Sequence, residues 1–257
     1  MPSESSRILI DFDPPVARIS LRNPPLNVID IPMMIELGTA LEDIETKPGI
    51  SVILLKSLQR DFSAGVDVAA HTPHNIREML AKFHGVILAL VHSRKVSIAA
   101  VHGNCFGGGA ELAAVCDLVY TAESAVWGFP EIKLGCYPPV AATMLSALVG
   151  PKHAADLILT GRNISGREAF DMGLANRAVP EAEVDSAVHE ALDGLVKLSP
   201  AVLAVAKKAI YVWESMHFQK GLTRAEQIYL DELMNTEDAR EGIAAFLEKR
   251  QPIWKGK

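Results

Sequence analysis

The sequence predicts an α/β core followed by a purely helical segment, and three observations carry this prediction. Short apolar runs typical of buried strands alternate with amphipathic helical stretches as far as Pro180. Beyond Pro180 only helical patterns occur. The chain has 257 residues, of which 49% are hydrophobic and 22% are charged, so it is long and apolar enough to bury a large core.

The first elements are expected to be two strands and a helix. Ile8–Phe12 and Val16–Leu21 are short apolar runs joined by Pro14 and Pro15, a pattern that predicts a hairpin. Ile31–Thr46 has apolar residues at helical spacing and is closed by a Pro-Gly pair, so it predicts a helix. The next elements are a long amphipathic helix and three buried strands: Asn75–His92, Val52–Leu55, Ile98–Val101 and Leu118–Tyr120.

The pattern changes in the last third of the chain. Ser165 and Glu168 have the spacing of a capping box, which predicts a short helix that Gly173 ends. Ala175–Val179 is expected to be the last strand of the core. The pattern then predicts helices at Glu183–Lys197, Pro200–Ser215, Gly221–Asn235 and Asp238–Lys249.

Composition argues against several classes of function. The formal net charge of −6 disfavours binding to nucleic acid through bulk electrostatics. The longest apolar runs, such as Val86–Val91, are too short to span a bilayer, and the polar N-terminus does not have the pattern of a signal peptide. Cys105, Cys116 and Cys136 are an odd count in apolar surroundings, which predicts free buried thiols in a reducing compartment. We therefore expect a cytoplasmic protein without a membrane or nucleic-acid partner.

The most informative segment is Ala99–Asp117, in which an apolar strand leads through Gly107–Gly109 into a helix. A triple glycine lets a ligand approach the backbone closely, because no Cβ intervenes. The start of the helix leaves unpaired N–H groups and the positive end of the helix dipole at this turn, where they can hold negative charge on an oxygen. Glu111 lies in the first helical turn, so its carboxyl projects toward that oxygen. For the glycines alone, a tight turn without a ligand is the alternative.

Two flanking segments complete a pattern that resembles the crotonase family, which comprises enoyl-CoA hydratases and isomerases. Phe62–Asp67 is similar to the family's FSAGAD loop, with valine at the fifth place. Gly107–Ala113 matches the family's glycine-rich turn and helix, and Pro130–Ile132 matches its Pro-Glu-Ile segment. The resemblance extends from about Ile8 to Trp254. It implies that the α/β core is a spiral of β-β-α turns, which is more than the residue pattern alone predicts.

The resemblance also implies how the chain is organised. Residues 1–195 are expected to form the α/β core with an acyl-CoA site, and residues 196–257 a C-terminal helical oligomerisation region. In the family such a region packs against neighbouring subunits, so we expect a homotrimer or a homohexamer. CoA is carried by the substrate, so no metal, redox cofactor or prosthetic group is expected. Trp254 and Lys255 are expected to cover the adenine.

Residue roles follow from the same resemblance. The backbone N–H groups of Ala64 and Gly108 are expected to hold the thioester oxygen of an acyl-CoA in an oxyanion hole. Glu111 is expected to act as the base toward water at the β-carbon, and Glu131 as the acid toward the α-carbon. Two carboxyls with separated pKa values can divide the work in this way. The other residues expected to contact the substrate or its CoA are Gly65, Val66, Asp67, Trp127, Phe129 and Tyr137.

Departures from the family pattern concern the acyl end of the expected pocket. Phe129 stands where the family usually has glutamine, Trp127 lies two residues earlier, and Tyr137 precedes a Pro-Pro-Val-Ala stretch. Flat aromatic walls suit a flat ring, and this stretch resembles hydratases of alicyclic dienoyl-CoA thioesters from anaerobic aromatic-ring breakdown. The alternatives are a hydratase of short linear enoyl-CoA thioesters, an enoyl-CoA isomerase, or an RNA-binding module with this fold. The acid pair favours a hydratase over an isomerase, and the acidic composition disfavours RNA.

Overall fold

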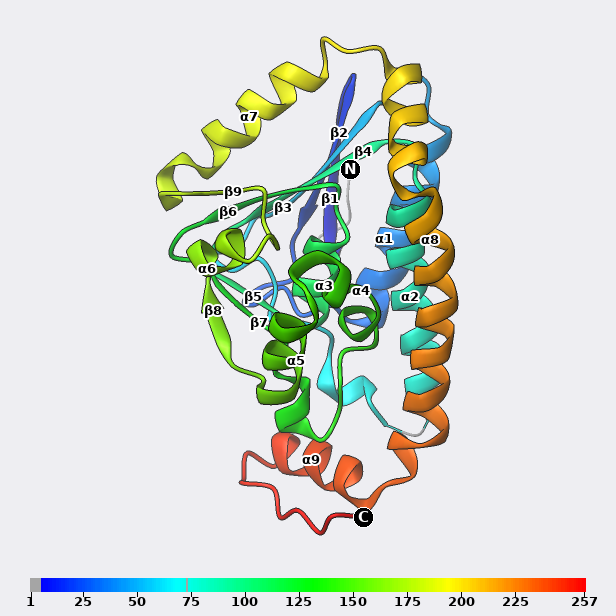
Figure 1. The fold of residues 1–257 in the computed structure, drawn as a ribbon, viewed down its shortest axis with the longest axis vertical. Coiled ribbons are helices and arrows are strands. Elements are labelled where there is room, and N and C mark those ends of the chain that lie inside the picture. Colours follow the sequence, from blue (N-terminus) through cyan, green and yellow to red (C-terminus); the bar gives the residue numbers. More distant parts are fainter. Residues whose placement is uncertain (1–5, 73) are drawn as a thin grey trace.

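The computed structural model describes residues 6–72 and 74–257, with the backbone alone for residues 212–216. Its main sheet has the strand order β1-β2-β3-β4-β6-β9 and crosses the upper part of the molecule in Figure 1. The β1–β2 pair is antiparallel and forms the predicted hairpin, whereas every later pair is parallel. The strands are β1 Ile8–Asp13, β2 Val16–Leu21, β3 Val52–Ser57, β4 Val96–Val101, β6 Leu118–Ala122 and β9 Arg177–Val179.

A smaller sheet lies next to the main one and holds the segments of the predicted site together. Its order is β5-β7-β8, with β5 and β7 parallel and β7 and β8 antiparallel. One isolated bridge joins Ser63 to Cys105 on β5, and another joins Ile29 to Val66. These bridges fix the loop after β3 beside the glycine-rich turn. The strands are β5 Asn104–Phe106, β7 Val126–Gly128 and β8 Asn163–Ser165.

Helices pack on the main sheet and extend away from it. All six residues of β4 are buried, since α3, α7 and α8 contact this strand. Asp30 caps α1 by accepting a hydrogen bond from the Met33 N–H, and Ser165 and Glu168 form the predicted capping box at α6. The helices are α1 Ile31–Thr46, α2 Ile76–His92, α3 Gly108–Ala114, α4 Pro139–Val149, α5 Pro151–Thr160, α6 Gly166–Asp171, α7 Val184–Leu195, α8 Pro200–Asp231 and α9 Glu237–Leu247.

The long helix α8 corrects one prediction. The sequence pattern predicts two helices separated near residue 220, whereas the structure has one continuous helix from Pro200 to Asp231. Gly221 does not end a helix, because it lies where α8 meets α4. A Cβ at this position would come within 2.6 Å of Thr143 Cγ2 on α4, so glycine permits a close helix–helix approach. Figure 1 shows α8 running along the side of the molecule beside α1 and α2.

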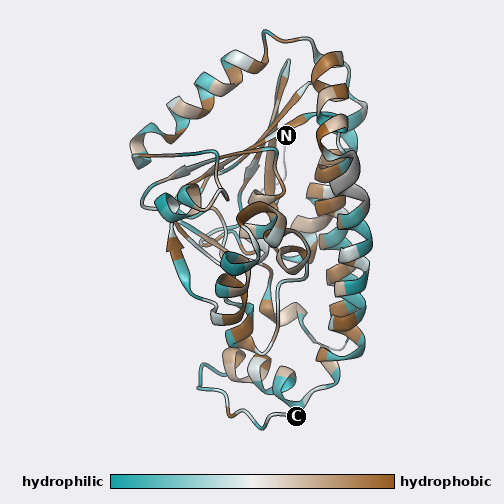
Figure 2. Ribbon diagram, in the orientation of Figure 1, coloured by the Kyte–Doolittle hydropathy of each residue, from teal (hydrophilic) through white to brown (hydrophobic). Residues whose placement is uncertain are grey.

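Hydropathy follows this architecture. Figure 2 shows apolar residues concentrated on the strands and on the inward faces of the helices, with hydrophilic residues on the outer faces. The cysteines Cys105, Cys116 and Cys136 are free and buried, as predicted. Among the described residues, no helix has the length and apolar character needed to cross a membrane.

Candidate active site

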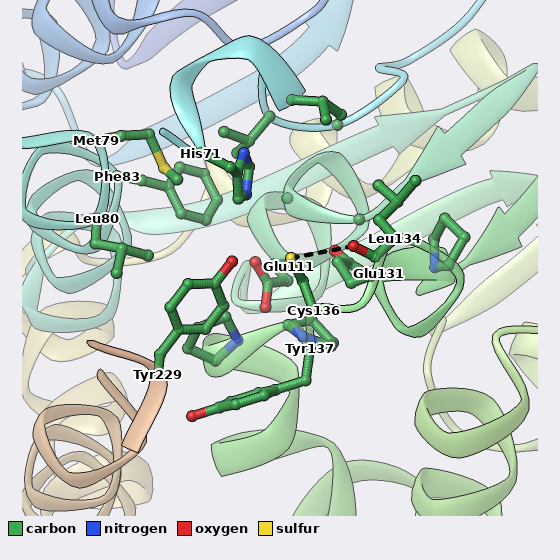
Figure 3. Close-up of a pocket in the computed structure, with 18 of the residues that line it drawn as sticks. His71, Met79, Leu80, Phe83, Glu111, Glu131, Leu134, Cys136, Tyr137 and Tyr229 are labelled. Carbon is green, nitrogen blue, oxygen red and sulfur yellow. Dashed lines mark hydrogen bonds between the residues drawn. The ribbon is translucent and has the colours of Figure 1, made fainter. Parts of the chain in front are cut away.

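A cavity of about 690 Å³, counting the part open to solvent, lies between α2, α3, α8 and the short helix η2, Pro130–Leu134. Figure 3 shows that Glu111, Glu131 and Tyr229 reach it from three different elements. The predicted site residues that line the cavity are Ala64, Gly65, Val66, Gly108, Glu111, Glu131 and Tyr137. The fold thus brings Ala64 together with Tyr229, which lies 165 positions later in the chain.

The backbone hydrogen bonds of the loop Phe62–Asp67, called the first loop below, determine which of its N–H groups are free to face the cavity. The Ala64 N–H donates to the Leu26 carbonyl at 2.9 Å, so it is not free for a ligand. In the bridge to Ile29, the Ile29 N–H donates to the Gly65 carbonyl and the Asp67 N–H donates to the Ile29 carbonyl. Strand-like pairing of this kind turns the Val66 N–H to the opposite side, and within the described chain it has no hydrogen-bond partner. The predicted donor Ala64 is therefore wrong, and Val66 takes its place.

The second donor lies in the glycine-rich turn. Gly108 is the first residue of α3, where N–H groups have no partner inside the helix, and its N–H is unpaired within the described chain. A Cβ on Gly108 would lie 2.5 Å from Val66 Cγ2, so the turn and the loop are in direct contact. A Cβ on Gly107, whose φ is +50°, would lie 2.6 Å from Glu131 Oε1. Glycine is required at both positions because neighbouring groups occupy the space of a side chain.

Glu111 is buried and held by the backbone of α4. It projects from the first turn of α3 and is 3% exposed. Its Oε1 accepts a hydrogen bond from the Ala141 N–H at 2.8 Å, at the positive N-terminal end of α4. Burial raises the pKa of Glu111 to about 7, while hydrogen bonds from the backbone of Ala141 and Val140 oppose the rise. These bonds favour the ionised form.

Glu131 reaches the same cavity from η2. It lies in the first turn of η2, and its Oε2 is buried with no hydrogen-bond partner among the described residues. Burial, and then the charge of Glu111, raises the pKa of Glu131 to about 8. The charge of Glu111 is one cause of the raised pKa of Glu131, so the two carboxyls titrate as a pair that holds one proton near neutral pH. The Ala141 N–H favours the charged form of Glu111, and Glu131 Oε2 has no such donor among the described residues.

The predicted aromatic walls require a correction. Trp127 and Phe129 are fully buried in the hydrophobic core and do not line the cavity. The Trp127 Nε1–H donates to Thr121 Oγ1 at 3.0 Å, which directs the indole ring toward β6. Asp67 also lies outside the lining, since its side chain accepts from the Ala69 N–H at 3.0 Å and caps the short helix η1, Val68–Ala70.

Other aromatic residues form the wall instead. Phe83 reaches the cavity from α2 and Tyr229 from α8, and the ring of the predicted Tyr137 lies below Glu111 in the view of Figure 3. The ring centroids of Tyr137 and Tyr229 are 5.3 Å apart in an edge-to-face arrangement. Tyr229 belongs to residues 196–257, so the site is not confined to residues 1–195 as predicted. Periodicity could mark Phe83 only as a buried helix residue, and nothing local to Tyr229 indicates a site.

Sequence reasoning also missed a pair between a buried histidine and a half-buried carboxylate. His84 on α2 is 4% exposed and lines the cavity, and its Nδ1 lies 2.6 Å from Glu226 Oε2 on α8. This hydrogen bond lowers the pKa of Glu226. His71 lines the cavity as well, and burial lowers its pKa. In the described part of the chain, no three His, Cys, Asp or Glu side chains are grouped so that they could hold a metal ion.

The two predicted residues at the C-terminus lie apart from this cavity. Trp254 is 47% exposed, and Lys255 Nζ lies 3.1 Å from Glu237 Oε2 at the start of α9. Neither residue lines the cavity. Their expected contact with the adenine stays a prediction.

Solved structures and curated proteins place this fold and site in a known class. A structure described as an enoyl-CoA hydratase/isomerase from Xanthobacter autotrophicus superposes with a TM-score of 0.85 at 29% identity, over 95% of this chain and 97% of that chain. An enoyl-CoA hydratase from Mycobacterium avium subsp. paratuberculosis shares the fold with a TM-score of 0.88 at 23% identity, over 97% and 98%. The predicted crotonase-type fold is thereby confirmed.

Sequence comparison identifies the family. Residues 11–257 match the profile described as enoyl-CoA hydratase/isomerase, and the chain belongs to this family. A cyclohexa-1,5-dienecarbonyl-CoA hydratase from Thauera aromatica is 32% identical over 99% of this chain and 98% of its own. A probable enoyl-CoA hydratase from Bacillus subtilis is 36% identical over 97% and 98%. The prediction that the chain is an enzyme of the hydratase type is confirmed.

Proposed function

We propose that this protein adds water across the conjugated double bond of an α,β-unsaturated acyl-CoA thioester, with Glu111 and Glu131 as its catalytic pair. The supporting observation is that these two buried carboxyls share a cavity with two unpaired backbone donors. The N–H groups of Val66 and Gly108 suit the thioester oxygen, on which enolate charge develops. One such preorganised donor contributes about 3–4 kcal/mol to transition-state stabilisation.

In the proposed reaction, Glu111 activates the water, the two backbone N–H groups hold the enolate, and Glu131 donates a proton. The oxygen of a water molecule bonds to the β-carbon, and the Glu111 carboxylate takes one proton of that water. The π electrons move onto the thioester oxygen, which the two backbone donors hold as an enolate. The enolate then takes the proton of Glu131 at its α-carbon. A proton returns from Glu111 to Glu131, so the net change is the addition of one water.

For the acyl group we propose an alicyclic dienoyl thioester, cyclohexa-1,5-diene-1-carbonyl-CoA. Phe83, Tyr137 and Tyr229 supply flat apolar walls, which suit a flat ring, although only Tyr137 among them was indicated by the sequence. The Thauera aromatica relative, a cyclohexa-1,5-dienecarbonyl-CoA hydratase, supports the same substrate class. The Bacillus subtilis relative supports the competing candidate, a linear enoyl-CoA.

We further propose a cytoplasmic homotrimer or homohexamer that needs no cofactor beyond the CoA of its substrate. The support for assembly is an apolar face on the first turns of α8, where Val202 and Val205 are 66% and 68% exposed and Ile210 is 68% exposed. Monomeric proteins rarely leave contiguous apolar surface of this kind in water.

Product mass tests the proposed function. The purified protein is incubated with cyclohexa-1,5-diene-1-carbonyl-CoA and with crotonyl-CoA in separate reactions. We expect the cyclic thioester to gain one water faster than the linear one. The reverse preference would make the protein a short-chain enoyl-CoA hydratase. Unchanged mass with a shifted double bond would identify an isomerase, and no reaction with either thioester would contradict the paired-carboxylate mechanism.

A further inference from the structure

The cavity collects buried polar atoms that lack partners. Within the described chain, the buried side-chain nitrogens and oxygens without a hydrogen bond are His84 Nε2, Glu131 Oε2 and Tyr229 Oη, and all three residues line the cavity. Buried polar groups in folded proteins are nearly always paired, because a buried group without a hydrogen bond loses its hydration and gains nothing in return. A cavity with several such atoms is built for a polar occupant. Glu131 has a role in the proposed reaction, whereas Tyr229 has none.

Tyr229 is held rigidly with its hydroxyl in the cavity. The residue is 1% exposed, and Figure 3 shows its hydroxyl directed toward Glu111. Its ring packs edge-to-face on Tyr137, whose own hydroxyl donates to the Ala225 carbonyl on α8 at 2.6 Å. The nearby Cys136 thiol donates to the Leu134 carbonyl at 3.6 Å, so it offers Tyr229 only sulfur, a weak acceptor.

The hydration reaction also requires a water molecule held in a fixed orientation. A water in a protein interior needs two to four polar partners, and the Glu111 carboxyl, which the Ala141 N–H holds at Oε1, lines the cavity as one of them. Glu131 supplies a second partner. We propose that the Tyr229 hydroxyl is the third: it accepts the second proton of the reacting water, so that one O–H faces Glu111 and a lone pair faces the β-carbon. This inference rests on the proposed function.

The Tyr229 phenol also stays in the neutral form that this role requires. Burial is the main cause that raises the pKa of this phenol far above its ordinary value. The hydroxyl therefore stays protonated throughout the working pH range, and it touches the reacting water as a neutral group that both donates and accepts. By this assignment Tyr229 is a catalytic residue that α8, from the C-terminal region, contributes to the site.

Tyr229→Phe removes the hydroxyl and keeps the ring. Two rates are measured in wild type and variant: hydration of whichever thioester the wild type uses faster, and exchange of the α-protons of the corresponding saturated acyl-CoA in D₂O. Exchange needs the oxyanion hole and Glu131 but no attacking water. We expect hydration kcat to fall about 10- to 100-fold, with KM changed less than about 3-fold, while α-proton exchange stays within about 2-fold.

Thermal unfolding separates this role from a structural one. Removal of an unpaired buried hydroxyl does not destabilise a protein, so the variant should melt at the wild-type temperature or above. Tyr211→Phe is the matched control, because it removes a hydroxyl from α8 that interacts with Asp117 outside the cavity, and its hydration rate should be unchanged. A parallel loss of hydration, exchange and melting temperature in Tyr229→Phe, or undiminished hydration, would overturn the assignment. A wild type that neither hydrates nor exchanges would instead refute the proposed function.

Discussion

Glu111 and Glu131 differ chemically through their hydrogen-bond partners, since burial raises the pKa of both. The Ala141 N–H at the start of α4 lowers the free energy of the charged Glu111, whereas Glu131 Oε2 has no donor within the described residues. Two identical side chains can therefore act as base and acid in one cavity. The spacing of the sequence motifs predicts the pair, but the division of roles depends on which carboxyl the backbone of α4 reaches.

The shared proton predicts the pH dependence of kcat/KM. Burial raises the pKa of Glu111 to about 7 and that of Glu131 to about 8. As the pH falls below the lower value, the pair binds a second proton and loses its base. As the pH rises above the higher value, it loses the shared proton and its acid. We expect a bell-shaped profile with its maximum between these two values, measured by initial rates of hydration.

A variant checks that the alkaline limb belongs to this pair. In Glu131→Gln the acid is removed, so the activity that remains should be at least about 100-fold lower and should no longer fall at high pH. A wild-type optimum near pH 5, or an alkaline limb that survives in Glu131→Gln, would mean that other groups control the rate.

At the scale of single elements, α8 is continuous because packing overrides the local preference of glycine. Gly221 interrupts the helical pattern of the sequence, yet its lack of a side chain lets α8 lie against Thr143 of α4. The continuous helix then carries Tyr229 to the cavity and Glu226, one turn earlier, to the cavity-lining His84. A break near residue 220 would have left their position undetermined.

Two glycine substitutions test this explanation, because they should change the thermal stability in opposite directions. Gly221→Ala places a Cβ 2.6 Å from Thr143 Cγ2, and overpacking of this kind costs about 1–3 kcal/mol, more than the gain in helix propensity. Gly194→Ala on α7 is the matched control, because a Cβ there meets nothing within 4 Å and helix propensity alone should add up to about 1 kcal/mol. Thermal unfolding should show the first variant melting below the wild type and the second at or above it. A stabilised Gly221→Ala would contradict the close α8–α4 contact.

At the scale of the whole molecule, the start of α8 is an apolar surface that the fold leaves exposed. Figure 2 shows this end of the helix as apolar, and Val202, Val205 and Ile210 are each about two-thirds exposed or more. Burial of this face between subunits would stabilise an assembly by about 25 cal/mol for each Å² of apolar surface removed from water. The same helix therefore carries the proposed interface at its start and the cavity-lining Tyr229 near its end.

Sedimentation velocity tests the proposed assembly. We expect the wild type to sediment as a trimer or hexamer and Val205→Asp to shift toward smaller species, since a charge buried between subunits is strongly unfavourable. Thr223→Asp adds the same charge at an exposed polar position of α8 and should leave the distribution unchanged. A wild type that sediments as a monomer would refute the proposed trimer or hexamer, and an unchanged distribution for Val205→Asp would assign the interface to another surface.

The sequence by itself determined the alternation of strands and helices, the glycine-rich turn and the two carboxyls, because each depends on local pattern or on motif spacing. Only the tertiary structure decided which N–H group of the first loop is free. The Ala64 N–H donates to the Leu26 carbonyl, whereas pairing with Ile29 leaves the Val66 N–H directed away from Ile29 and without a partner in the described chain. The tertiary structure also decided that Trp127 points into the core and that Tyr229 completes the site. The direction of a side chain or an N–H is set by partners far away in the chain, and a local sequence pattern carries no information about them.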